Sequence, residues 1–105
     1  MLWLLLTALL TIQVSPTSLM AGSTVRVVCK VEPHADNRTV EAGVGEYMRS
    51  ARQLDGAASR KTFEFWFSHV PCGTEAAFCV VHQTRGRSTV QQRPLQVAGC
   101  DGALP

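Results

Sequence analysis

The sequence lacks the features by which many protein classes are recognised. A transmembrane helix needs about 20 apolar residues, and the apolar run from Leu2 to Val14 meets Ser15 and Pro16 before it reaches that length. The formal net charge of the 105 residues is only +2, too weak a bias to indicate a nucleic-acid partner. The chain contains no nucleotide-binding motif, internal repeat or low-complexity linker, and no cofactor is predicted.

The segment from Leu2 to Val14 has the length of a signal-peptide core. Ala21 is the best candidate for the residue before a cleavage site, so we expect a signal peptide at residues 1–21 and a single domain at residues 22–105. Basic residues usually precede such a core, and here they are missing. An uncleaved membrane anchor is therefore the alternative. The expected location is secreted or periplasmic.

Four cysteines suit a small exported domain, because disulfides of about 2–4 kcal/mol each supplement a small core in an oxidising compartment. Cys72 and Cys100 are equidistant from Gly86, the tip of a predicted hairpin, so they would face each other across it. This pairing leaves Cys29 with Cys79. A local loop between Cys72 and Cys79 is the rival arrangement.

The chain after residue 21 alternates with a period of two, which indicates strands. Strands are predicted at residues 25–31, 40–44, 63–67, 76–84 and 88–97, and the segment 47–54 is left open between a strand and an irregular crossover. Gly86 supplies the positive φ of a hairpin turn. The strand at 76–84 is apolar on both faces and should be central, whereas Pro94 marks the last strand as an edge or a bulge. This spacing predicts a sandwich of two antiparallel sheets.

The strand at 63–67 should supply much of the core. Its phenylalanines alternate with Glu64 and Trp66, and they should be buried against the valines of the strand at 25–31. The expected cluster is Phe63, Phe65 and Phe67 with Val25, Val27 and Val31.

Several of these residues resemble those of an immunoglobulin-like domain. Cys29 in an early strand, the aromatic strand that ends at Pro71, and the run from Ala76 to Cys79 are similar to that family, in which cysteines of two facing sheets are bridged. The segment from Leu54 to Pro71 also looks like small exported bacterial domains of fibronectin or immunoglobulin type. The resemblance implies a small immunoglobulin-like antiparallel β-sandwich.

A zinc site is an alternative, because His69 and Cys72 mirror the spacing of Cys79 and His82. Cys79 and His82 are three residues apart in a strand and should face opposite ways. We therefore favour disulfides and predict no metal. A cysteine and histidine nucleophile pair can also be written, but nothing fixes a base within reach, and the chain is short for framing a pocket. The prediction is that the protein is not an enzyme.

Two surface features are candidates for binding. The tip formed by Arg85, Gly86 and Arg87 presents guanidinium groups suited to carboxylates or phosphates. Trp66 faces away from the phenylalanines and is either an exposed contact or, as we favour, covered by residues 47–54. Asn37-Arg38-Thr39 matches an N-glycosylation acceptor. The chain is expected to be an exported, non-enzymatic binding or structural module, with a membrane-tethered accessory domain as alternative. Its expected partner is another protein or a cell-surface component.

Overall fold

The computed structural model describes residues 9–46, 48–58 and 61–99, most of which lie in strands. Within these residues, no helix has the length and apolar character needed to cross a membrane. Two one-turn 3-10 helices, η1 (Gly56–Ala58) and η2 (Thr84–Gly86), accompany the strands. The strands are β1 (Leu10–Ser15), β2 (Ser18–Met20), β3 (Val25–Val31), β4 (Asn37–Val44), β5 (Met48–Gln53), β6 (Thr62–Phe67), β7 (Ala76–Gln83), β8 (Ser88–Pro94) and β9 (Gln96–Ala98).

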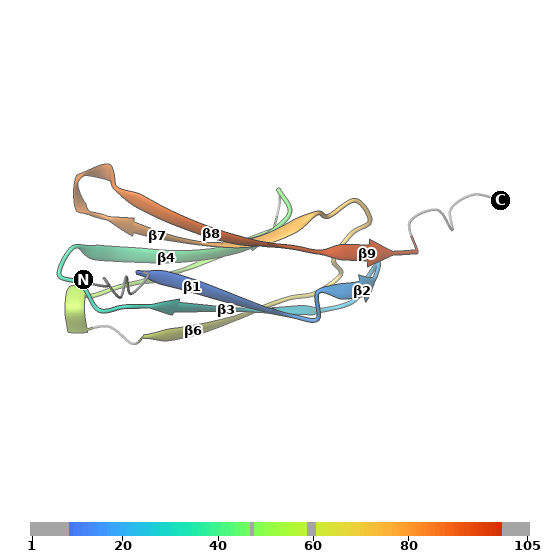
Figure 1. The fold of residues 1–105 in the computed structure, drawn as a ribbon, viewed down its shortest axis with the longest axis horizontal. Helices are drawn as coiled ribbons and strands as arrows, with labels where there is room; N and C mark the ends of the chain where they lie inside the picture. The colour runs from blue at the N-terminus through green and yellow to red at the C-terminus, as the bar shows by residue number, and fades with distance from the viewer. Residues whose placement is uncertain (1–8, 47, 59–60, 100–105) are drawn as a thin grey trace, which may run out of the picture.

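Two antiparallel sheets lie face to face (Figure 1). One has the order β1-β3-β6 and the other the order β5-β4-β7-β8. A parallel pair, β2 with β9, joins the two layers at the end away from the β7–β8 hairpin. The prediction of an all-β, antiparallel sandwich is confirmed.

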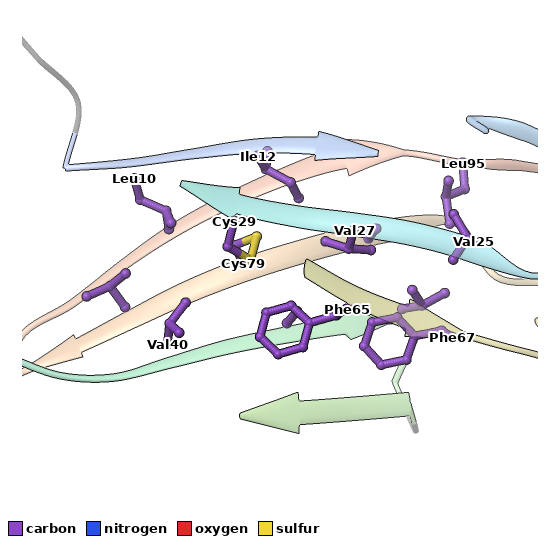
Figure 2. Close-up of a cluster of buried hydrophobic side chains, with 14 of the residues drawn as sticks. Leu10, Ile12, Val25, Val27, Cys29, Val40, Phe65, Phe67, Cys79 and Leu95 are labelled. Atoms are coloured by element: carbon purple, nitrogen blue, oxygen red, sulfur yellow. A yellow bond between two sulfur atoms is a disulfide. The ribbon is translucent and has the colours of Figure 1, made fainter. Parts of the chain in front are cut away.

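The core lies between the sheets, where each strand turns alternate residues inward (Figure 2). Phe65 is 2% exposed and Phe67 is 6% exposed, and they pack with the valines of β3 as predicted. Phe63 is half-buried and packs against this cluster. Cys29 of β3 and Cys79 of β7 are both fully buried and form a disulfide across the sandwich, with their Cα atoms 5.9 Å apart. The predicted pairing of these two cysteines is confirmed.

The β7–β8 hairpin has the predicted place in its sheet, with β7 central and β8 at an edge. Its register is symmetric about Arg85, since Ala76 pairs with Pro94 and His82 with Ser88. The predicted centre at Gly86 is therefore wrong by one residue, because Arg85 as well as Gly86 adopts a positive φ in the turn. Cys72 is disulfide-bonded, and its predicted partner at position 100 lies outside the described residues.

The second half of the expected leader forms β1 and β2. Leu10 and Ile12 are buried while Thr11 and Gln13 are exposed, and β1 pairs along its whole length with β3. Leu19 of β2 is also buried. Cleavage after residue 21 stays a prediction, but this structure gives residues 10–20 a place in the sandwich.

The segment left open at 47–54 contributes the edge strand β5, paired with β4. Because β5 belongs to the four-stranded sheet, it does not cover the outer face of β6. Trp66 is accordingly 62% exposed. The prediction that residues 47–54 cover this side chain is wrong.

Candidate functional site

Three polar side chains form a hydrogen-bonded chain across the outer face of the four-stranded sheet. His82 of β7 lies directly opposite Ser88 of β8 in the register, and Glu41 of β4 lies diagonally across from His82. The His82 Nδ1 atom is 3.1 Å from the Ser88 Oγ atom. The His82 Nε2 atom is 3.3 Å from Glu41 Oε1. We call these three residues the relay.

The strand period explains why the relay faces outward. Val40 and Ala42 flank Glu41 in β4 and are fully buried, and Val81 precedes His82 in β7 and is fully buried as well. Since successive side chains of a strand point to opposite faces, Glu41 and His82 must point away from the core. The relay therefore follows from the same alternation that builds the core.

Arg49 holds the second oxygen of Glu41. Its Nη1 atom is 3.2 Å from Glu41 Oε2, and its guanidinium carbon lies 5.0 Å from the centroid of the Phe78 ring. The Phe78 ring in turn lies over Gly43, where an added Cβ atom would overlap it. Gly43 therefore leaves room for the aromatic ring on which Arg49 rests.

The surroundings of Glu41 keep its carboxyl group ionised. Burial raises the pKa of Glu41. Hydrogen bonds from His82 and Arg49, together with the charges of these residues, lower the pKa by a larger amount, so that it lies below the ordinary 4.5. A carboxylate only accepts hydrogen bonds, so the imidazole donates from Nε2 to Glu41 whether or not it carries a charge. In the neutral form of the ring, Nδ1 accepts a hydrogen bond from the Ser88 hydroxyl.

The relay is open to solvent. The side chain of His82 is 44% exposed, that of Glu41 is 21% exposed, and Ser88 lies on the surface. A surface cavity of about 420 Å³ lies further along the same sheet and reaches Phe78 and Gln92. Neither His82 nor Ser88 lines this cavity. A molecule can thus reach Ser88 without any rearrangement of the fold.

The predicted binding tip lies beside the relay. Arg85, Gly86 and Arg87 are exposed and immediately precede Ser88. Among the interactions of the described residues, neither arginine side chain forms a hydrogen bond or an ion pair. The structure thus brings the tip next to Ser88 and leaves Trp66, the other predicted binding residue, on the other sheet.

The structure separates the residues of the alternative zinc site. Cys79 is in the buried disulfide, Cys72 is also disulfide-bonded, and His69 lies in an exposed loop. Cys79 and His82 point to opposite faces of β7, as their spacing predicted. Nowhere in the described ranges do three or more histidine, cysteine or acidic residues gather so that they could hold a metal ion. The zinc alternative is therefore wrong.

The glycosylation acceptor at Asn37 is buried. Its side chain is 1% exposed, its Nδ2 atom donates to the Glu32 carbonyl oxygen at 3.0 Å, and its Oδ1 atom accepts from Gln83 Nε2 at 2.9 Å. A glycan cannot be attached to this amide in the folded domain. Asn37 instead ties the start of β4 to the end of β7.

Sequence reasoning missed two members of the relay, Glu41 and Ser88. His82 enters the sequence analysis only as a member of the alternative zinc site. The hairpin could have indicated Ser88, because residues equally far from its centre face each other, and His82 and Ser88 are equally far from Arg85. Glu41 is 41 residues from His82 in sequence, and only the β4–β7 register brings them together.

The sequence matches no protein-family model and no curated protein. The fold is similar to two single-residue variants of the superoxide reductase (neelaredoxin) from Ignicoccus hospitalis. The first has 13% identity and a TM-score of 0.65, and the match covers 84% of this chain and 78% of that one. The second has 14% identity and a TM-score of 0.66, with 86% and 82% covered. Spo0M, a sporulation control protein from Bacillus subtilis, has 14% identity, a TM-score of 0.50, and 84% and 48% covered.

These similarities contradict the prediction of a non-enzymatic binding or structural module. The argument against an enzyme rested partly on chain length, yet the superoxide reductases are enzymes that share this fold over most of a chain of similar size. Identity this low shows the fold alone, so any activity must be argued from this chain's own residues.

The described residues do not fit a metal centre of the kind that superoxide reduction suggests. Reduction of superoxide requires an electron donor, and a protein-bound transition metal held by histidine or cysteine ligands is one such donor. Here the sulfur atoms of Cys29, Cys72 and Cys79 are committed to disulfides. No cluster of other ligands replaces them in the described part of the chain. The relay is therefore the site on which we base a function.

Proposed function

We propose that the chain is a hydrolase of carboxylic esters that uses Ser88 as nucleophile. The observation that carries this proposal is the unbroken hydrogen-bonded chain from Glu41 through His82 to Ser88. A carboxylate, an imidazole and a hydroxyl in this order form the constellation that activates a serine, whatever the fold and chain order.

The reaction proceeds in two steps. The Ser88 Oγ atom attacks the ester carbonyl carbon, and its proton passes to His82 Nδ1, which then protonates the leaving alcohol. Water next attacks the acyl-serine, gives its proton to His82 in turn, and releases the acid with return of the proton to Ser88. Ser88 and His82 are the catalytic residues. Glu41 is a positioning residue that fixes the tautomer of His82 and stabilises its imidazolium form.

The arginine tip supports an anionic ester as the substrate. Arg85 and Arg87 bring two guanidinium groups to the turn that precedes Ser88, and their side chains are exposed. Guanidinium groups bind carboxylates and phosphates in bidentate fashion. They would hold an anionic group of the substrate and oppose the negative charge that develops on the carbonyl oxygen during attack.

We retain export of the chain, and action on a cell-surface component, as part of this proposal. The three cysteines in the described residues all lie in disulfides. Disulfides persist in oxidising compartments such as the periplasm or the extracellular space. This chemistry supports a secreted or periplasmic location.

We also propose that the sandwich is of immunoglobulin type. In support, the disulfide links the middle strand β3 of one sheet to the central strand β7 of the other. The last long strand lies beside β7 at the sheet edge. This arrangement resembles the bridged facing sheets of that family.

Hydrolysis of two esters tests the proposed activity. The full chain should hydrolyse 4-nitrophenyl hemisuccinate, which is anionic, with a higher kcat/KM than 4-nitrophenyl acetate, which is neutral. Ser88→Ala should abolish both activities, and His82→Ala should lower kcat by about 100-fold or more, the contribution of a general base. Replacement of Arg85 and Arg87 by alanine should remove the preference for the anionic ester.

Thr89→Ala is the matched control, because Thr89 is the neighbouring hydroxyl on β8 and points to the opposite face. Its activity should equal that of the unmodified chain. Equal rates for Ser88→Ala and Thr89→Ala would overturn the proposed nucleophile. Such a result would mean that the hydrolysis comes from other surface groups.

A further inference from the structure

Trp66 stands on a polar face that the proposed hydrolase reaction does not use. It lies on β6, and its neighbours across the three-stranded sheet are Arg26 of β3 and, beyond that, Ser15 of β1. At 62%, its exposure is large for an aromatic residue. Exposed tryptophan of this kind on a folded domain marks a contact surface more often than a packing residue.

The indole ring is held in place by two charged neighbours. The Trp66 Nε1 atom donates to Glu64 Oε1 at 3.2 Å, and the Arg26 guanidinium lies 5.9 Å from the ring centroid. Arg26 also forms an ion pair with Glu64. Hydrogen bonds from Arg26 and Trp66 lower the pKa of the Glu64 carboxyl group, which keeps this partner ionised. A side chain fixed before binding loses less conformational entropy when a ligand stacks on it.

The surrounding face is polar and close to neutral. Arg26 and Glu64 neutralise each other, and Lys30 is the one other charged residue in the three rows of side chains that cross the sheet here. Most other outward side chains of these three rows, and the neighbouring hydrogen-bonded pair of Thr24 and Ser68, carry hydroxyl or amide groups. They are Thr11, Gln13, Ser15, Thr24, Thr62 and Ser68.

We infer that this face binds a neutral saccharide, with one pyranose ring stacked on Trp66. The apolar C–H face of a pyranose matches an aromatic ring, and its hydroxyl groups match a border of hydroxyl, amide and paired charged groups. An anionic ligand would find the charge of Arg26 already compensated by Glu64, so that Lys30 alone among these rows would attract it. The surface cavity described above lies beside β4, β5 and β7, and it therefore offers no pocket for an apolar ligand on this face. Adjacent rows of polar side chains beside Trp66 suit an extended chain, so we choose β-1,4-linked sugars.

Titration of the full chain with cellohexaose and with hexa-N-acetylchitohexaose, both of which are neutral, followed by NMR, tests this inference. At least one of these oligosaccharides should shift the indole N–H resonance of Trp66, which is identified by its loss in Trp66→Phe. Trp66→Ala should weaken binding by about fivefold or more. Val90→Ala is the matched control, because Val90 is 55% exposed on the other sheet, and it should bind like the unmodified chain.

Three results would overturn the inference. They are the absence of any shift with both oligosaccharides up to about 10 mM, equal affinity of Trp66→Ala and Val90→Ala, and tighter binding of polygalacturonate, which is anionic, than of either neutral chain. The Ser88→Ala variant should bind the sugar normally. This last measurement separates failure of the saccharide site from failure of the proposed hydrolase.

Discussion

Replacement of Ile12 by alanine tests whether β1 belongs to the stable domain. Ile12 is 3% exposed and pairs in register with Cys29, beside the disulfide between the sheets. Truncation of a buried isoleucine removes its transfer free energy and leaves a cavity, so Ile12→Ala should lower the free energy of unfolding by about 2–5 kcal/mol. Gln13→Ala is the matched control. Its exposed side chain should change stability by no more than about 0.5 kcal/mol.

A chain that begins at Gly22 is the stronger form of the same test. It lacks Leu10, Ile12 and Leu19, and burial of each of these side chains is worth roughly 1.5–3 kcal/mol. The combined loss of roughly 5–9 kcal/mol approaches the whole stability of a typical domain, about 5–15 kcal/mol. We therefore expect this shortened chain to be unfolded or aggregated at 37 °C.

Urea denaturation followed by circular dichroism measures both effects. Equal midpoints for Ile12→Ala and Gln13→Ala would refute the packing of β1. If the shortened chain were as stable as the full one, the packing of β1 would be refuted more strongly. That result would favour residues 22–105, which cleavage after Ala21 leaves, as the stable domain. The intact mass of the exported protein then identifies which of the two chains is present.

Three further predictions concern other parts of the sandwich. Phe65→Ala should cost about 3–5 kcal/mol in the same denaturation assay, while Glu64→Ala should leave the free energy of unfolding nearly unchanged. Similar costs would mean that the inward and outward faces of β6 are exchanged. Asn37→Ala should cost about 1–3 kcal/mol by leaving buried groups unpaired. Expression in a glycosylating host should add no glycan at Asn37, and an N-glycan found there would contradict the burial of this side chain. The pKa of Glu41 is lower in the folded state than the ordinary 4.5. The contribution of Glu41 to the stability of the fold should therefore be complete above pH 4.5 and lost as the pH falls through the folded-state pKa. Glu41→Gln should flatten the dependence of stability on pH in the acid range, and an unchanged dependence would count against the relay.

The sequence predicts the strands that carry a clear alternation. Val25, Val27 and Val31 share one face of β3 opposite Arg26 and Lys30, Phe65 and Phe67 share one face of β6 opposite Glu64 and Trp66, and all five are buried. The cysteine pair at the centre of the sandwich was predicted in another way, since the pairing of Cys72 with Cys100 leaves Cys29 with Cys79. Burial of one face per strand is a local property, so a single sequence contains it.

Other features depend on information that a local pattern does not contain. Leu10 and Ile12 also alternate with polar residues, but the long apolar run before them indicated a leader, so β1 was not recognised. The exposure of Trp66 depends on which sheet β5 joins. The relay depends on the pairing of three strands, and a shift of one residue in either register would separate its members. These contacts are non-local, and alternation leaves them undetermined.

Mass spectrometry after reaction with a fluorophosphonate tests the central claim most directly. Such a reagent phosphonylates an activated serine and releases fluoride, whereas an ordinary surface serine reacts far more slowly. The account predicts a single adduct on the peptide that contains Ser88, its loss in Ser88→Ala, and a rate about 100-fold lower in His82→Ala. No adduct on the unmodified chain, or equal labelling of Ser88 with and without His82, would contradict it.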